Sequence, residues 1–337
     1  MARKVPKLED VARLAGVSTA TVSRCLNEPD KVVSQTRERV MAAVKTLGYA
    51  PNFNARALAA RRTQTIGAII PTMKNAIFAE GIQAFQEALQ AEGFSLLIAF
   101  SAYDADLEAE GIRNLVARGA DAILVIGFDR DASVFQFLDD QEIPVLVAWA
   151  FDPESEHVCI GFDSKAAMAG LVSQAIALGH RRIGMISARQ AGNDRARARV
   201  AGVQLAMKDA GLSVDDLVIE ETEFGLPQAG VAFERLIARS PDLTLLVGGN
   251  DVLAAGAIRR ASDLGYSVPA DFSVIGFDDI ALAELVTPGL TTVRVPHRAM
   301  GEASAQALVA MVRGQRAESQ ELATEVCLRD SLAAPRA

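Results

Sequence analysis

From residue 65 onward, short apolar runs alternate with amphipathic stretches, and this alternation limits the possible folds of the 337-residue chain more than any other feature. The apolar runs are IGAII, SLLIAF, AILVIG, PVLVAW, RIGMIS, LTLLVGG and FSVIGF. A short continuous apolar run is typical of a strand buried on both faces, and strands that alternate with helices form parallel sheets covered on both sides. The order occurs twice, over roughly 65–161 and 162–292, and the segment after Thr291 supplies a further helix and strand. The sequence therefore predicts an α/β body of two doubly wound lobes.

The first 62 residues differ from the rest in charge. They contain twelve basic and five acidic residues, a formal charge of +7, whereas residues 63–337 contain 22 basic and 37 acidic residues, a charge of −15. A basic head attracts polyanions and an acidic body repels them, so the head is a candidate for binding nucleic acid. A basic segment can also be a solvated arm, and the residue pattern has to decide between the two.

That pattern predicts three short helices in the head. The apolar stripe of the first is formed by Leu8, Val11, Ala12, Leu14 and Ala15. Gly16 is placed to end this helix, and Ser18 is a natural N-cap for a second helix that begins at Thr19. A step of 100° per residue puts Val22, Cys25 and Leu26 on one side of the second helix and Thr19, Ala20, Ser23 and Arg24 on the other. A third helix from about Ser34 carries Val40, Val44 and Leu47 and ends at Gly48, which completes an all-α helix-turn-helix unit.

Two segments, LEDVARLAGVSTATVSRCLN and TRERVMAAVKTLGYAPNFNARAL, resemble the N-terminal module of the lactose/galactose repressor (LacI/GalR) family of transcription regulators. The resemblance implies that base edges are contacted by Thr19, Ala20 and Arg24. It implies that the DNA backbone is contacted by Ser18, Thr21, Ser23 and Asn27. The chemistry of Arg24 agrees, because a guanidinium forks onto guanine in the major groove. The alternative for each of these residues is an ordinary solvated surface position.

Residues 52–62, NFNARALAARR, favour a helix that is too short to be stable alone in water. In the family, two such hinges from a dimer fold in the minor groove and insert a leucine at the central base step. The resemblance places Leu58 at the leucine position and Asn52, Ala55 and Arg56 at neighbouring contact positions. The alternative is a linker helix that packs Leu58 on protein.

The body also resembles the family's core, which is similar to periplasmic sugar-binding proteins and has three crossovers between its lobes. We therefore expect a helix-turn-helix domain at 1–50, a hinge at 51–63, and an effector-binding and dimerisation domain at 64–337. The expected N-lobe is 64–161 plus 293–324, and the expected C-lobe is 162–292 plus 325–337. Ligands of such folds bind at the carboxyl ends of the strands, between the lobes.

Five residues of the body match effector positions of the family. Asn75 and Phe78 belong to PTMKNAIFAE, where Ala76 and Ile77 depart from the family pattern, and Arg199 ends NDRARAR. Asn250 in GGND and Asp278 in GFDD complete the set, while Asp251 is expected to cap the helix that follows it. A fork donor, an amide and a carboxylate suit a polyhydroxylated or carboxylated small molecule. The alternative for Phe78 is core packing.

The sequence favours an anionic effector. IPVLVAW carries Trp149 where the lactose-repressor branch has an aspartate that holds sugar hydroxyls, and Arg189, Arg195 and Arg197 surround Arg199 in the sequence. IGFDSKAAM and ISARQAGNDRARAR resemble, more weakly, the branch that regulates gluconate and related sugar acids. We therefore expect a sugar acid such as gluconate or ketogluconate. The alternatives are that Arg195 or Arg197 is solvated and Trp149 belongs to the core, with a neutral sugar or a purine as effector.

Catalysis, metal binding and export are not expected. GxGxxG, GxxxxGK[ST], GxSxG and HExxH motifs are absent, and His157, His180 and His297 have no partner at ligand spacing. His180 is expected to cap a helix end. The start, MARKVPKLED, has no apolar region after it, and Cys25, Cys159 and Cys327 form no CxxC pair, which fits the cytoplasm. We expect no enzyme, no cofactor, no metal and no membrane partner.

The sequence thus predicts a cytoplasmic, nucleoid-associated transcription regulator, with repression as the favoured direction. It is expected to bind a pseudo-palindromic operator in double-stranded DNA as a homodimer or tetramer, under allosteric control by the effector. The competing interpretation is a periplasmic-type sugar-binding protein without DNA control, which needs a signal peptide and no basic head.

Overall fold

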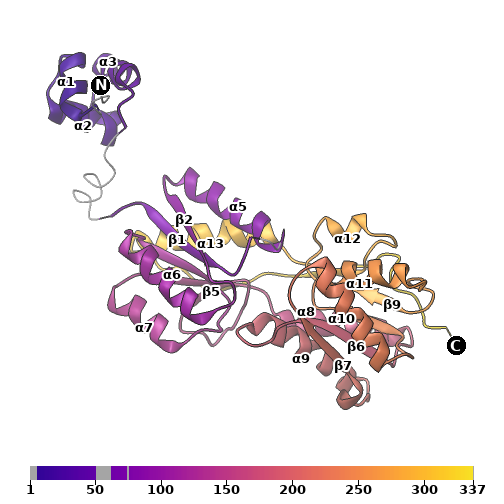
Figure 1. The fold of residues 1–337 in the computed structure, drawn as a ribbon. Coiled ribbons are helices and arrows are strands. Elements are labelled where there is room, and N and C mark those ends of the chain that lie inside the picture. The colour runs from indigo at the N-terminus through magenta and orange to yellow at the C-terminus, as the bar shows by residue number, and fades with distance from the viewer. Residues whose placement is uncertain (1–5, 51–61, 74–75, 337) are drawn as a thin grey trace. The chain divides into compact units, whose positions relative to one another are not determined.

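The computed structural model describes residues 6–50, 62–73 and 76–336, apart from the side chains of Asn27, Pro29 and Ala76. The chain forms two compact units, residues 1–63 and 64–337 (Figure 1).

The first unit contains the three expected helices, α1 (Leu8–Ala15), α2 (Thr19–Asn27) and α3 (Ser34–Leu47), with a 3₁₀ turn between the last two at Pro29–Lys31. Their buried core consists of Val11, Ala12, Ala15, Val22, Cys25, Val40 and Ala43. Gly16 and Gly48 end α1 and α3 in the left-handed conformation, with φ of 66° and 62°. Leu14 is expected in the apolar stripe of α1, but it is 54% exposed. It lies about 100° around the helix from the middle of the buried face.

The body contains two parallel sheets, as the sequence predicts. The strands of the first lobe are β1 (Thr65–Ile70), β2 (Ser95–Phe100), β3 (Ala122–Ile126), β4 (Val145–Ala148), β5 (Val158–Gly161) and β11 (Gln320–Glu321). They pair in the order β11-β5-β4-β3-β1-β2. The second sheet has the order β7-β6-β8-β9, with β6 (Ile183–Ala188), β7 (Val218–Thr222), β8 (Leu245–Gly248) and β9 (Ser273–Ile275). The edge strand β7 is not predicted from sequence, because its residues, VIEET, are half-exposed and form no continuous apolar run.

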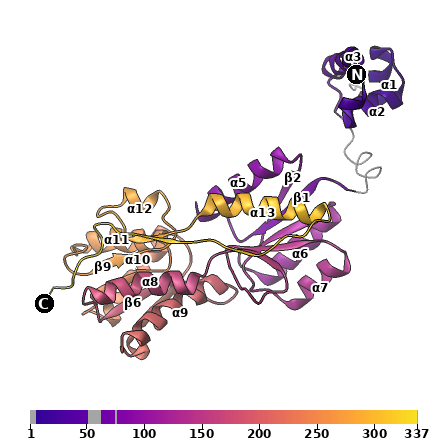
Figure 2. The same cartoon turned by 180° about the vertical axis from the view of Figure 1, so that it is seen from behind.

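Helices cover both faces of each sheet. In the first lobe α5 (Ala76–Ala91) packs beside α13 (His297–Val312), while α6 (Ala105–Ala117) and α7 (Ala132–Asp140) belong with the opposite face (Figure 2). In the second lobe α8 (Ser164–Ala177) packs on α9 (Asp194–Asp209), and α10 (Leu226–Arg239) packs on α11 (Asp251–Asp263). Two short elements complete this lobe, the 3₁₀ turn Val214–Asp216 and α12 (Leu282–Leu285).

The chain passes between the lobes three times, after β5, before α13 and after β11. Near the last two passages β10 (Thr292–Arg294) pairs antiparallel with β12 (Glu325–Cys327). The C-terminal segment then returns to the second lobe, where the Ser331 hydroxyl donates to the Val274 carbonyl at 2.6 Å. Three segments of the chain therefore link the lobes, and linking segments of this kind are where two-lobed proteins hinge.

Candidate functional site

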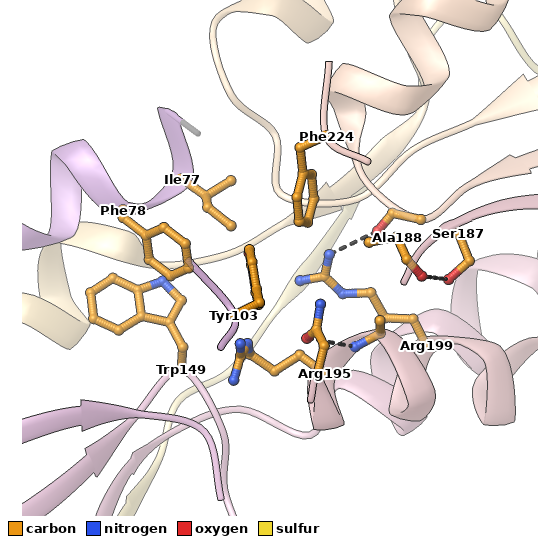
Figure 3. Close-up of a pocket in the computed structure, with 12 residues that line it drawn as sticks. Ile77, Phe78, Tyr103, Trp149, Ser187, Ala188, Arg195, Arg199 and Phe224 are labelled. Atoms are coloured by element: carbon orange, nitrogen blue, oxygen red, sulfur yellow. Dashed lines mark hydrogen bonds between the residues drawn. The ribbon is translucent and has the colours of Figure 1, made fainter. Parts of the chain in front are cut away.

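A pocket lies between the lobes, at the carboxyl ends of the parallel strands (Figure 3). The first lobe contributes Ile77, Phe78, Tyr103 and Trp149. The second contributes Ser187, Ala188, Asn193, Arg195, Ala196, Arg199, Phe224 and Gly249. This is the edge at which a doubly wound fold binds its ligands.

One wall of the pocket is aromatic. Trp149 follows β4 with a left-handed backbone, φ 61°, and its ring meets Phe78 edge to face with ring centres 5.6 Å apart. Both side chains belong to the buried core of the first lobe, and both also line the pocket. Core packing and a place in the binding site, which the sequence leaves as alternatives, therefore hold together for Phe78 and Trp149. The indole Nε1 of Trp149 is buried without a hydrogen-bond partner among the described residues, which leaves a donor for a ligand.

A second aromatic pair spans the lobes and was not predicted from sequence. Tyr103, after β2, stacks on Phe224, after β7, with ring centres 5.6 Å apart and planes 23° apart. Ala102 and Tyr103 both have positive φ, 52° and 62°, a conformation that non-glycine residues rarely adopt outside functional loops. Burial raises the pKa of the Tyr103 hydroxyl, and Arg195 partly offsets this rise.

Arg199 lies at the back of the pocket in a buried ion pair. Its Nη2 donates to Asp278 Oδ1 at 3.1 Å, its Nη1 donates to the Gly249 carbonyl at 2.8 Å, and its guanidinium lies 4.0 Å from the centre of the Phe277 ring. Burial raises the pKa of Asp278 to about 6, although the charge of Arg199 opposes this. Asp278 is 1% exposed and does not reach the pocket surface.

Asn250, and not Asp251 as expected, caps α11. Asn250 caps α11, since its Oδ1 accepts from the Leu253 amide at 2.9 Å, and it does not line the pocket. Asp251 does not cap the helix: it is fully buried and accepts from the Thr292 hydroxyl at 2.6 Å and the Ile280 amide at 2.9 Å. Asn and Asp are both good N-cap residues, so the sequence alone does not decide which of the two caps α11. The contact of Asp251 with Thr292, which is distant in sequence, leaves Asn250 as the cap.

The three arginines near Arg199 in sequence have different environments. Arg195, one helical turn before Arg199, is buried and lines the pocket. Arg197 and Arg189 are both exposed; Arg197 pairs with Asp129 at 2.7 Å, and Arg189 pairs with Glu223 at 3.0 Å. The described pocket lining therefore includes two guanidinium groups and no carboxylate.

Two of the histidines, His180 and His297, are buried. His180 does not cap a helix as expected, because its Nε2 shares a 2.8 Å hydrogen bond with the Ala333 carbonyl and so fastens the C-terminal segment. Burial lowers the pKa of His297 to about 4, which keeps its ring neutral near pH 7. Among the residues with described positions, no three His, Cys, Asp or Glu side chains are arranged to hold a metal ion. No helix in the same ranges is long and apolar enough to cross a membrane.

In the head, the predicted base-contacting residues Thr19, Ala20 and Arg24 are exposed on α2. Thr21 and Ser23 are half-buried, and the Ser18 hydroxyl accepts from the Thr21 amide at 3.1 Å as the N-cap of α2. The remaining candidates lie outside what the structure describes, namely the side chain of Asn27 and residues Asn52, Ala55, Arg56, Leu58 and Asn75.

Comparisons with known proteins match both units. Residues 7–52 match the model for bacterial regulatory proteins of the lacI family, and residues 172–332 match a periplasmic binding protein-like domain. The HTH-type transcriptional regulator GntR of Pseudomonas aeruginosa is 30% identical over 97% of this chain and 95% of its own length. The HTH-type transcriptional repressor PurR of Vibrio cholerae is 33% identical over 96% of this chain and 97% of its own. The crystal structure of the lac repressor dimer bound to operator and the anti-inducer ONPF is 25% identical over 98% of this chain and 100% of its own, with a TM-score of 0.86.

Proposed function

Because this chain belongs to the lacI family of bacterial regulatory proteins, we propose that it is a homodimeric repressor whose affinity for a pseudo-palindromic operator is set by a sugar acid in the inter-lobe pocket. Its relatives over almost the whole chain are transcription regulators, so the protein is a regulator and not an enzyme.

For DNA, support comes from the exposed face of α2 and from the charge of the head. Arg24 is exposed beside Thr19 and Ala20, in a unit whose net charge is opposite to that of the body. A guanidinium on this face can fork onto a guanine, while short hydroxyls bind phosphates. The lac repressor was crystallised as a dimer on its operator, and we propose the same two-fold arrangement here.

For the effector, the observation that carries the proposal is the pair of arginines, Arg195 and Arg199, in a pocket lining without a described carboxylate. Guanidinium groups bind carboxylates more strongly than neutral hydroxyls. Trp149 and Phe78 would flank the carbon chain of the ligand. Arg199 Nε, Asn250 Nδ2 and Asp278 Oδ2 are buried without partners among the described residues, and we propose that effector hydroxyls satisfy them when the lobes admit the ligand.

Control of DNA binding then follows by linkage. The effector stabilises one arrangement of the two lobes, and in the dimer that arrangement sets the separation of the two hinges. Only one separation lets both heads reach successive half-sites. An effector that lowers operator affinity acts as an inducer, and one that raises it acts as a corepressor.

The test is to select an operator from random duplexes and then titrate it by fluorescence anisotropy with and without gluconate, 2-ketogluconate, glucose or a purine. We expect a pseudo-palindromic site, and an affinity that changes at least tenfold with a sugar acid and not with the neutral ligands. Arg24→Ala should cost about 1 to 3 kcal/mol, confined to one base pair in each half-site. A response to glucose or a purine alone would contradict the sugar-acid proposal and leave the regulator intact.

A further inference from the structure

We propose that Arg195 is the residue that binds the effector's carboxylate, and that through its contact with Ile126 this binding holds the two lobes closed. The inference rests on the proposed function of the pocket and assigns its specificity and its regulation to one side chain. The resemblance to the family assigns effector binding to Arg199, and the geometry points to its neighbour one turn earlier on α9.

Hydrogen-bond capacity separates the two arginines. Both terminal nitrogens of Arg199 donate to protein oxygens, to Gly249 and Asp278, and one face of its guanidinium is covered by Phe277. A carboxylate on this fork would compete with Asp278, which is already bound there. Arg199 is therefore held as part of the pocket wall.

Arg195 has a fork that a ligand can use. Its Nη1 donates to the Ile126 carbonyl at 3.2 Å and to Asp194 Oδ1 at 2.7 Å, which uses both N–H groups of that nitrogen. The Nε and Nη2 edge, the two parallel donors that bind a carboxylate side-on, lies on a side chain that lines the pocket. In Figure 3 the guanidinium extends from the start of α9 toward Trp149 and Tyr103.

The same side chain joins the lobes. Arg195 belongs to the second lobe and Ile126 ends β3 of the first. Next to this contact the Phe128 amide donates to Asp194 Oδ2 at 2.6 Å, again from the first lobe to the second. Gly127, between the two first-lobe residues, has φ of 69°, and any side chain there would overlap Arg195 and Asp194. We call these contacts of residues 126–128 with Asp194 and Arg195 the lobe latch.

The Tyr103 hydroxyl also contacts the Arg195 side chain. A carboxylate that takes the place of this contact on the Nε and Nη2 edge would restrict Arg195 to the rotamer that reaches Ile126. The ligand therefore stabilises the latched arrangement by more than it stabilises an open one, which is the differential affinity that a ligand needs to shift an equilibrium. A neutral ligand that fills the same pocket lacks this effect. Preference for a charged ligand and closure of the lobes should therefore both depend on Arg195.

Calorimetry on the full chain tests the binding half, with gluconate and gluconamide, which differ only in carboxylate against amide. Wild type should bind gluconate at least tenfold more tightly than gluconamide, and Arg195→Met should reduce this ratio to less than twofold. Arg195→Lys, which keeps a charge without the fork, should give an intermediate ratio and serves if the methionine variant does not fold. Arg189→Met removes an exposed arginine outside the pocket lining and should leave the wild-type ratio unchanged.

The single tryptophan of the sequence, Trp149, tests the closure half, because it lines the pocket. The two ligands are compared at equal occupancy of the pocket. In wild type and in Arg189→Met, gluconate should protect Trp149 from acrylamide quenching more than gluconamide does. In Arg195→Met the two ligands should protect it equally. No acid preference in wild type, or an undiminished preference in both Arg195 variants, overturns the inference. Failure of the proposed function would be seen separately, as a chain that selects no operator.

Discussion

At the scale of single residues, buried ionisable groups gather behind the pocket where strand ends of the second lobe meet β10. Asp251 is the most shifted: burial and the nearby charge of Asp278 raise its pKa to about 8, while the Thr292 hydroxyl opposes the rise. The raised pKa favours the protonated carboxyl near pH 7, and its Oδ1 accepts from the Thr292 hydroxyl, 2.6 Å away. This carboxyl acts as a structural hydrogen-bonding group that joins α11 to the start of β10.

The raised pKa makes stability depend on pH in a definite direction. Above about pH 4 the unfolded chain has lost the proton of Asp251 that the folded body keeps up to about pH 8, so folding stability falls as the pH rises through this window. Urea unfolding followed by circular dichroism should show wild type less stable at pH 9 than at pH 7. Asp251→Asn, whose amide can bond both Thr292 and Ile280, should remove most of this difference.

Between pH 7 and pH 9 the neighbouring ionisable groups contribute little to the change in stability. Asp278, with a pKa of about 6, and His297, with a pKa of about 4, complete most of their titration below pH 7. An equal loss of stability between pH 7 and pH 9 in wild type and Asp251→Asn would show that Asp251 is already ionised in the folded body.

At the scale of helices and strands, sequence patterns predict the fold well where burial is continuous. The longer runs of Ile, Leu and Val predict their strands. Neither β5 nor β7 is predicted: β5, because VCIG is only four residues long, and β7, because VIEET lies at a sheet edge with half-exposed side chains. In the site, Trp149 and Arg199 follow from strand ends and from family resemblance. Tyr103 could not be predicted, because its place depends on two successive residues with positive φ. Arg195 and Asp251 depend on partners 69 and 41 residues away in sequence, Ile126 and Thr292.

The junction of β3 with α7 provides an element-scale prediction about the lobe latch. Gly127→Ala should force residues 126–128 away from α9, because the added methyl overlaps Asp194 and Arg195. We expect Trp149 of the unliganded variant to be more accessible to acrylamide than in wild type, and gluconate to bind at least fivefold more weakly.

Gly93→Ala is the matched control, because Gly93 also has positive φ, 80°, but an added methyl there meets no described atom within 4 Å. It carries the backbone strain, about 1 to 2 kcal/mol, without the collision. If both variants changed Trp149 quenching equally, the effect of Gly127 would be attributable to lost stability and not to the latch.

At the scale of the whole molecule, charge is divided between the two compact units. Residues 1–62 carry +7 and residues 63–337 carry −15, so the body should add no attraction to DNA and should oppose binding that is not directed through the head. The segment 51–61 that joins the units lies outside the described residues, and its sequence is the basis for the hinge proposal.

The charge division and the hinge lead to separable expectations for DNA binding. Phosphate contacts by the basic head release counterions, so affinity for operator and for random DNA should both fall steeply with salt, with a linear dependence of the logarithms.

Leu58→Ala removes no charge, and it should leave both salt slopes unchanged. If Leu58 opens the central base step, the variant should lose affinity for the operator and bind random DNA as before. The reason is that only in the operator complex is the duplex bent by the inserted side chain. Anisotropy titrations of both duplexes at several salt concentrations measure the slopes and affinities together. Equal losses on the two duplexes would show that Leu58 packs on protein in a linker helix instead of entering the minor groove.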